Sequence, residues 1–269
     1  MSSAAASAPA PWRAEFLSHL ARLESPLCAL STVRPATGPS SLATPRVRTV
    51  VFRGMWGSLA ENPKNPAPRN PPVFESDHLT ITTDARMDKA GEIAPSLLSL
   101  EEGDAPSDTP GTDGGGAYEA VFWVPDVMTQ WRLSGKAYLL GPDVESDDPR
   151  AVRVREAVSR GVRTVGEGTF SWEREVTAHF GNLSPGMRGT FRNPPPGRPV
   201  GEGAGGEGLG LGQTVEDLHD EIARKNFRVV VLVPDDVDKV DLSDPERATR
   251  WRFRYVGDDD GWDTTELWP

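Results

Sequence analysis

The chain has 269 residues, and its 29 Lys and Arg against 40 Asp and Glu give a formal net charge of −11. This acidic balance argues against sequence-independent nucleic-acid binding, which requires a basic surface. A single cysteine, Cys28, excludes an internal disulfide and any cysteine-rich zinc site.

The sequence contains no obvious membrane span or secretory leader. No apolar run approaches the ~20 residues that a membrane-spanning helix needs. Residues 1–10 are rich in Ser, Ala and Pro and lack a basic start followed by an apolar stretch, so they predict a disordered tail. We therefore expect a cytoplasmic protein with no membrane partner.

The first third of the chain predicts one helix and three strands. Apolar residues spaced by four, four and three positions predict a helix over residues 11–23, with a proline in its first turn. Apolar and β-branched runs predict strands over 27–33, 47–52 and 78–83. Residues 56–72 are rich in Pro and Asn and predict a long loop.

An acidic insertion follows the third predicted strand. Asp84 is expected to cap a helix that runs from about Ala85 towards Ile93. Residues 95–116 carry several acidic side chains, no basic ones and a final Gly-Gly-Gly. Because such a segment is too polar to pack, we expect a flexible insertion there.

The middle of the chain has the clearest periodicity. Residues 119–124 predict a strand, and residues 130–139 alternate strictly between polar and apolar side chains, which is typical of a half-buried strand. Helices are predicted over 148–165 and 171–180. Residues 194–212 are rich in Pro and Gly and predict a linker-like loop.

The C-terminal part predicts further strands over residues 227–233, 237–242 and 250–256. An acidic turn is expected at 257–261, and residues 262–268 close the chain. Because the strands mostly follow one another through loops, we expect a mainly β fold with appended helices (α+β), built as an antiparallel barrel.

The long loops interrupt one core and do not separate two types of composition. We therefore expect a single domain over residues 11–269, with flexible insertions near 95–116 and 198–213.

Familiar catalytic and metal-binding patterns are missing. The four histidines lie in no recognisable triad setting, and the chain has no Gly-x-Ser-x-Gly elbow. No two histidines are within helical spacing, so we expect no metal site. A Walker-type loop and a dinucleotide-binding fingerprint are also absent from the sequence.

Cations and hydroxyls instead gather on or just after the predicted strands: Arg48, Arg53, Thr82, Thr83, Arg86, Lys89, Gln130, Arg132, Ser134, Arg250, Arg252 and Arg254. Arginine and hydroxyl groups can hold a phosphate together, whereas charged residues on a strand often serve only to keep an outer face wet. Arg48 and Arg53 are an odd number of residues apart, so sharing one ligand requires a bend or a strand end between them.

Short motifs occur in an order that is typical of one protein family. Two of them are Arg48-Thr49-Val50-Val51-Phe52-Arg53 and Gln130-Trp131-Arg132-Leu133-Ser134-Gly135, and the others lie at 10–13, 30–35, 83–89, 122–123, 183–188 and 194–197. With these segments the chain resembles the FMN-binding split-barrel family of pyridoxamine 5′-phosphate oxidase-like proteins. It is most similar to a poorly characterised branch that opens with a Pro-Trp helix.

The resemblance implies an FMN-binding split β-barrel that forms a homodimer, with FMN at the subunit interface and a small-molecule substrate. By the same resemblance, Arg48 and Lys89 meet the FMN phosphate, Arg53 lies near the isoalloxazine ring, and Gln130 contacts the flavin. The implied cofactor-binding set is Arg48, Thr49, Val50, Arg53, Thr82, Thr83, Arg86, Lys89, Gln130, Arg132 and Arg250, and no catalytic residue is assigned.

The chain departs from the true oxidases at the substrate positions. Asp88 precedes Lys89 where those enzymes carry an arginine, and Arg86 is expected to substitute for it. A tryptophan position falls at Val240, and an Arg-x-His motif falls at residues 246–248, which are Glu-Arg-Ala. The resemblance therefore favours an FMN-dependent oxidoreductase with an unidentified substrate. A genuine pyridoxamine or pyridoxine 5′-phosphate oxidase and a non-catalytic flavin-binding protein stay as alternatives.

Overall fold

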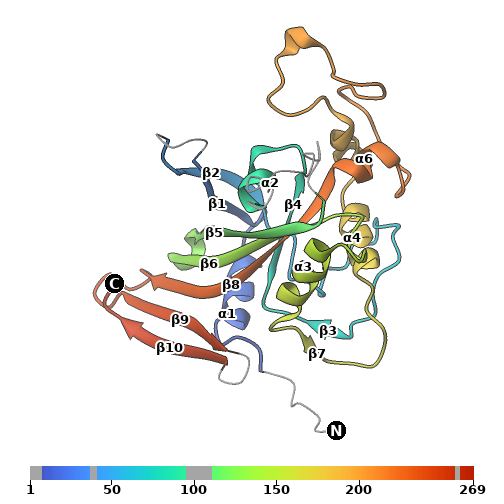
Figure 1. Ribbon diagram of the computed structural model, residues 1–269. Coiled ribbons are helices and arrows are strands. Elements are labelled where there is room, and N and C mark those ends of the chain that lie inside the picture. The colour runs from blue at the N-terminus through green and yellow to red at the C-terminus, as the bar shows by residue number, and fades with distance from the viewer. Residues whose placement is uncertain (1–7, 37–40, 95–110, 258–260) are drawn as a thin grey trace.

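The computed structural model describes residues 8–36, 41–94, 111–257 and 261–269 (Figure 1). The strands are β1 (Leu27–Arg34), β2 (Thr44–Val51), β3 (Phe74–Glu75), β4 (Leu79–Asp84), β5 (Asp113–Val124), β6 (Thr129–Leu140), β7 (Arg163–Thr164), β8 (Phe227–Asp241), β9 (Thr249–Gly257) and β10 (Gly261–Leu267). The helices are α1 (Arg13–Leu20), α2 (Asp88–Ile93), α3 (Pro149–Ser159), α4 (Trp172–Gly181), α5 (Pro185–Gly189) and α6 (Glu221–Asn226). Short 3₁₀ turns are η2 (Pro125–Val127), η3 (Thr190–Arg192) and η4 (Val200–Glu202).

Eight strands form one antiparallel sheet in the order β10-β9-β8-β6-β5-β1-β2, with β4 also paired to β8. The residues after β2 close the sheet into a barrel, because Arg53 N–H donates to Thr80 O at 2.8 Å and Thr80 N–H donates to Gly54 O at 2.9 Å. The mainly β, antiparallel fold expected from the sequence is therefore confirmed.

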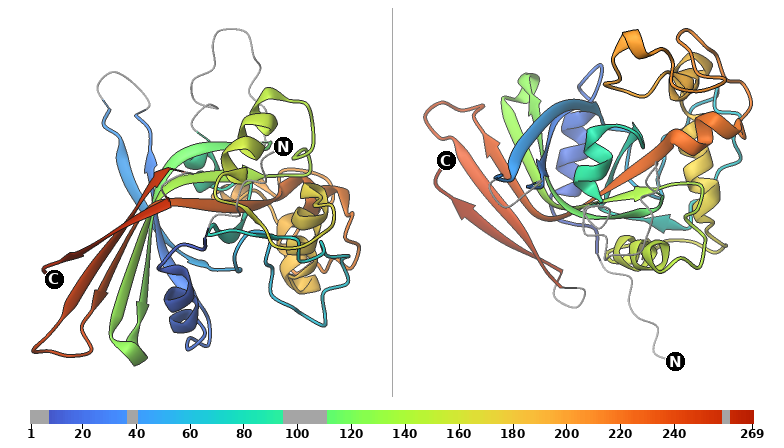
Figure 2. Two further views of the ribbon diagram at one scale, coloured as in Figure 1. Left: turned by 90° about the horizontal axis from the view of Figure 1, so that it is seen from below. Right: turned by 45° about the horizontal axis from the view of Figure 1, so that its top comes forward.

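Strand β8 has two different neighbours along one edge, and this separates the barrel from the β9–β10 hairpin. Its other edge pairs with β6 from Val229 to Asp241. On the changing edge, residues 227–232 pair with β4 and residues 236–241 pair with β9. Pro234 lies between the two stretches and has no N–H to donate. The β9–β10 hairpin therefore leaves the barrel on one side, away from α3, α4 and α6 (Figures 1 and 2).

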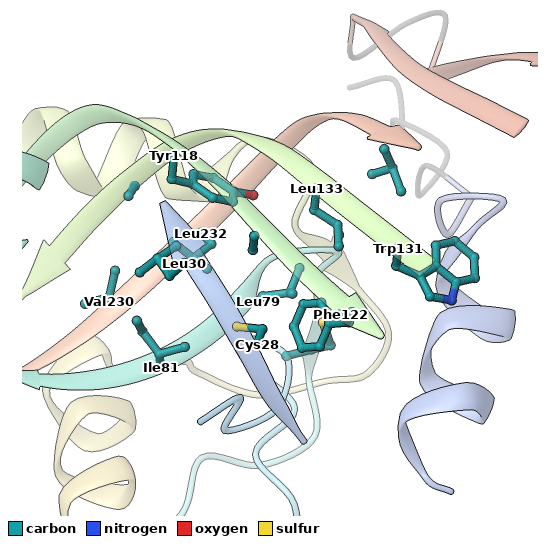
Figure 3. Packing of buried hydrophobic residues seen from close by; sticks show 14 of the residues in the cluster. Cys28, Leu30, Leu79, Ile81, Tyr118, Phe122, Trp131, Leu133, Val230 and Leu232 are labelled. Carbon is teal, nitrogen blue, oxygen red and sulfur yellow. The ribbon is translucent and has the colours of Figure 1, made fainter. Parts of the chain in front are cut away.

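The barrel interior is apolar and α1 plugs one end of it. Trp12 and Phe16 of α1 are fully buried, and the Phe16 ring meets those of Phe122 and Trp131 edge to face at 5.2 and 5.5 Å. Inward-facing side chains from β1, β4, β5, β6 and β8 complete this core (Figure 3). A second apolar cluster lies between the outer side of β8 and the helices α3, α4 and α6. These two cores explain why β8 is buried on both faces.

Several boundaries predicted from the sequence are wrong. The helix expected from Ala85 begins at Asp88, because the Asp84 carboxylate binds the backbone N–H and guanidinium of Arg86 and caps no helix. The helix expected over 148–165 ends at Ser159, before Gly161 with its φ of +68°.

Two predicted strands are one, and the closing segment of the chain belongs to the sheet. Residues 227–233 and 237–242 were expected to be separate, but β8 continues through Pro234 because β6 pairs with both halves. The closing segment 262–268 lies almost entirely in strand β10. Of the tail 1–10 and the insertion 95–116, residues 1–7 and 95–110 lie outside the described residues.

The glycines that end the insertion belong to strand β5 and are not flexible linker. A Cβ atom on Gly116 would lie 2.6 Å from Glu92 O and 2.7 Å from Ile93 O. Only glycine therefore lets β5 pass this close to α2, and the close approach fixes α2 against the barrel.

Within the described residues, no helix is long and apolar enough to cross a membrane.

We predict that Gly116→Ala lowers the free energy of unfolding by about 1–3 kcal/mol, because the new methyl group overlaps the α2 backbone. Gly91→Ala is the matched control, since nothing lies within 4 Å of a Cβ there and alanine favours a helix. Urea denaturation of both variants measures the effect. Equal stabilities of the two variants would contradict the packing described for β5.

Candidate functional site

Lys89 is a half-buried cation that forms no ion pair with a carboxylate among the described residues. Its Nζ donates to Thr83 Oγ1 at 3.1 Å and lies 2.8 Å from Met87 Sδ. Burial lowers the pKa of Lys89, and the positive charge of nearby Arg48 lowers it further. An anion beside Lys89 would stabilise the charged form of this lysine. Lys89 and Thr83 are therefore a pair of side chains suited to binding an anion.

Next to Lys89 and Thr83, the buried carboxylate of Glu92 forms ion pairs with one arginine from β1 and one from β2. Arg48 Nη2 lies 2.6 Å from Glu92 Oε2, and Arg34 Nε lies 3.4 Å from Oε1. Thr32 donates its hydroxyl to Oε2 at 2.5 Å and accepts from Arg48. The Glu92 side chain is only 2% exposed, so this contact fixes the Arg48 guanidinium at the barrel wall.

The cluster carries an excess of positive charge. Its cations are Arg34, Arg48, Arg86 and Lys89. Its carboxylates are Asp84, which pairs with Arg86, Asp88, which pairs with Arg34, and Glu92. Four cations face three carboxylates, and one positive charge remains uncompensated. This local balance is opposite to the net charge of the chain.

Arg86, which was expected to assist at the phosphate, has a guanidinium that is already engaged. It donates to both oxygens of Asp84, at 2.9 and 2.6 Å, and to Asn193 O at 3.0 Å. Arg86 therefore ties the segment between β4 and α2 to the loop after η3.

Arg53 follows β2 and lies where the strand leaves the barrel. Its Nε atom is buried and has no hydrogen-bond partner among the described residues. Burial lowers the pKa of Arg53, and its charge contributes to the lowered pKa of His179. The Arg53 Nε–H is therefore a buried donor without a partner among the described residues, on the side of the barrel that faces α4.

Gln130, Arg132 and Arg250 form a second group on β6 and β9. Gln130 and Arg250 are both cross-strand partners of Val240. Arg250 Nε donates to Asp238 Oδ2 at 2.9 Å, and Arg132 Nη2 lies 3.7 Å from the same oxygen. The structure thus brings Arg132 and Arg250 together at Asp238, with Gln130 beside Arg250 across Val240.

The two groups lie on opposite faces of the same sheet. The cross-strand series Arg48, Leu30, Ala120 and Leu133 shares one face, which is the barrel interior. Gln130 and Arg132 alternate with Leu133 on β6 and therefore point outwards. One copy of the chain does not bring Arg48 and Lys89 together with Gln130, Arg132 and Arg250.

The other predicted site residues divide between these faces. Thr49 is exposed on the outer face of β2, whereas Val50 packs against the barrel core. Thr82 is half-buried on β4, and the neighbouring Thr83 is buried and faces Lys89. Val240 is half-buried on the outer face beside Gln130.

The sequence analysis missed the residues that position Arg48. Glu92 and Thr32 are 44 and 16 residues away from Arg48 along the chain, so no local pattern links the three. The available signal was Glu92 itself, an acidic residue one helical turn after Lys89.

The donor set around Lys89 fits a phosphate group. It offers an uncompensated ammonium, the Thr83 hydroxyl and the guanidinium of Arg48, which is about one-fifth exposed. The buried, unpaired Nε of Arg53 lies beyond the end of the same strand. These residues can hold an anionic ligand with an extended body.

Comparisons with known proteins show what the chain is similar to. Residues 9–141 match the family described as pyridoxamine 5′-phosphate oxidase, FMN-binding domain. The chain is 22% identical to an uncharacterized protein of Saccharomyces cerevisiae over 97% of this chain and 98% of that protein. It is also similar to the crystal structure of a pyridoxamine 5′-phosphate oxidase-related, FMN-binding protein from Nostoc punctiforme. That likeness has a TM-score of 0.59 and 22% identity, and it covers 98% of this chain and 100% of the other.

We predict that Glu92→Gln lowers the free energy of unfolding by about 1–3 kcal/mol, because Arg48 and Arg34 lose their buried partner. Glu61→Gln is the control, since Glu61 is 93% exposed and its pair with Arg69 should contribute less than about 1 kcal/mol. Chemical denaturation compares the two variants. Wild-type stability of Glu92→Gln would show that the buried carboxylate does not fix the arginines.

Proposed function

Since the chain belongs to the pyridoxamine 5′-phosphate oxidase-like family of FMN-binding split-barrel proteins, we propose that it is a flavin-dependent oxidoreductase with FMN bound between two copies. The observation that carries the proposal is the uncompensated cation Lys89, which lies beside Thr83 and Arg48 in a region of excess positive charge. FMN is the cofactor of this family, and its dianionic phosphate matches that charge.

The chain's residues have separate tasks in this proposal. Lys89, Thr83 and Arg48 hold the phosphate, and Glu92 keeps the Arg48 guanidinium in place. Arg53 lies towards the ring, where a cation stabilises negative charge on the reduced flavin. When bound, FMN supplies two-electron oxidation of a small-molecule substrate, and the protein supplies position and electrostatics.

An exposed apolar surface supports the proposed homodimer. Ala29, Val47, Val121, Leu27 and Trp123 lie on the outer face of β1, β2 and β5, and the exposed fractions of Val47, Leu27 and Trp123 are 71%, 47% and 43%. We call this surface the outer apolar face. Burying such a surface stabilises association.

Gln130 and Arg132 border the outer apolar face, because they are the cross-strand partners of Trp123 and Val121. A dimer through this face would carry the group of Gln130, Arg132 and Arg250 to a second copy. We propose that this group completes the second copy's flavin site, which a single chain leaves divided between two faces.

We predict that Lys89→Met weakens FMN binding by about 1–3 kcal/mol, because one charge-assisted hydrogen bond to the phosphate is lost. Riboflavin, which lacks the phosphate, should bind the variant and the wild type equally. Fluorescence titration of both flavins measures the difference, with Lys64→Met as an exposed-lysine control. Equal weakening of FMN and riboflavin would contradict the phosphate role of Lys89.

We also predict that Trp123→Asp shifts the protein from dimer to monomer, because a charge would be buried in the outer apolar face. FMN affinity should fall together with dimerisation. Sedimentation velocity measures the oligomeric state, and Val200→Asp serves as a control, because Val200 is 97% exposed in the loop at η4. A wild-type protein that stays monomeric at high concentration would rule out the two-copy site.

A further inference from the structure

Four aromatic residues surround a hollow on the helical side of the molecule, which we call the aromatic cleft. Trp56, Phe74, Phe170 and Trp172 line a space of about 460 Å³. The Phe74 and Phe170 rings are 5.2 Å apart, and the Trp56 and Trp172 rings are 5.4 Å apart. Three of the four side chains are only half-buried, so their faces are accessible to a ligand.

A second hollow of about 490 Å³ adjoins the first and shares Phe74 with it. Its lining is polar and acidic. Glu61, Glu75 and Glu175 contribute three carboxylates. Arg69, also in the lining, pairs with Glu61 at 3.5 Å, and Arg163 pairs with Glu75 at 3.8 Å. The two hollows together combine aromatic walls with one carboxylate, Glu175, that has no lysine or arginine ion pair among the described residues.

Glu175 is a buried carboxylate with one oxygen unsatisfied. Its side chain is 5% exposed, and Asn70 Nδ2 donates to Oε2 at 3.0 Å. Oε1 has no hydrogen-bond partner among the described residues. His179 Nε2 lies 3.8 Å from Oε1, but burial lowers the pKa of His179 to about 3, so the ring is neutral. Burial raises the pKa of Glu175, against the opposing effects of the hydrogen bonds from Asn70 and the Gly57 backbone and of the positive charge of Arg69.

We propose that the aromatic cleft and the hollow at Glu175 form a binding site for a small organic ammonium ion that carries an aromatic or other apolar group. The ammonium group donates to the Glu175 carboxylate and places a positive charge beside it. The apolar group packs among the aromatic rings, which attract a cation over their faces. A combined space of this size holds a small-molecule ligand.

This site lies apart from the proposed phosphate site. Trp56 N–H donates to His78 O, just before β4 begins, whereas Thr83 lies five residues further along the chain. At ~3.3 Å per residue, the two ends of β4 are about 16 Å apart. The inference does not rest on the proposed flavin chemistry, because the ligand contacts none of the residues assigned to the FMN phosphate. Arg53, which is assigned to the flavin ring, lies close enough to His179 of α4 for its charge to lower the pKa of that histidine.

The test compares two probes that differ only in charge at one end, 2-phenylethylammonium and 2-phenylethanol. Isothermal titration calorimetry on the full-length protein, with and without added FMN, measures both. We expect saturable binding of the ammonium probe, at least about ten-fold tighter than that of the alcohol. Glu175→Gln should weaken the ammonium probe by about ten-fold or more and leave the alcohol unchanged.

Glu173→Gln is the matched control, because Glu173 is on the same helix and exposed. It should bind the ammonium probe as the wild type does. Equal affinities for the two probes, wild-type affinity in Glu175→Gln, or no saturable binding of the ammonium probe would each overturn the proposal. The comparison of probes on the wild type holds even if the Glu175→Gln variant fails to fold.

Discussion

The change of partner along one edge of β8 is the constraint on which the arrangement of this protein depends. The first half of the strand closes the barrel through β4, and the second half carries the β9–β10 hairpin away from it. Pro234 cannot donate a backbone hydrogen bond, so the switch occurs where the ladder is already interrupted. As a result, Thr83 and Lys89 lie at the closed barrel, whereas Arg250 lies on the open hairpin.

Strand alternation then separates the candidate site into two halves. Arg48 shares the inner face with Leu133, and Gln130 and Arg132 lie on the outer face of the same strand as Leu133. No side-chain rearrangement brings residues on opposite faces of a packed sheet to one ligand. In the proposed dimer a second copy would do so without deforming the barrel, and the outer apolar face offers a surface for that association. The fold and the proposed dimer therefore have one physical origin.

Much of the fold could be predicted, because the strongest signals in the sequence are local. The alternation in β6 and the apolar spacing in α1 each operate within one element. Strand β8 was predicted as two strands, and only its pairing with β6 carries it through Pro234. Arg48, Thr83 and Lys89 were predicted and do lie near one another. Glu92 was missed because it meets Thr32 and Arg48 across 60 and 44 residues of chain.

The measurement that tests the central claim most directly is the absorbance spectrum of the purified protein, together with the mass of any molecule that acid releases from it. The account predicts the bands of an oxidised flavin and release of FMN at one molecule per chain. A colourless protein that also fails to bind added FMN would contradict it, because the uncompensated charge at Lys89 would then serve no flavin phosphate.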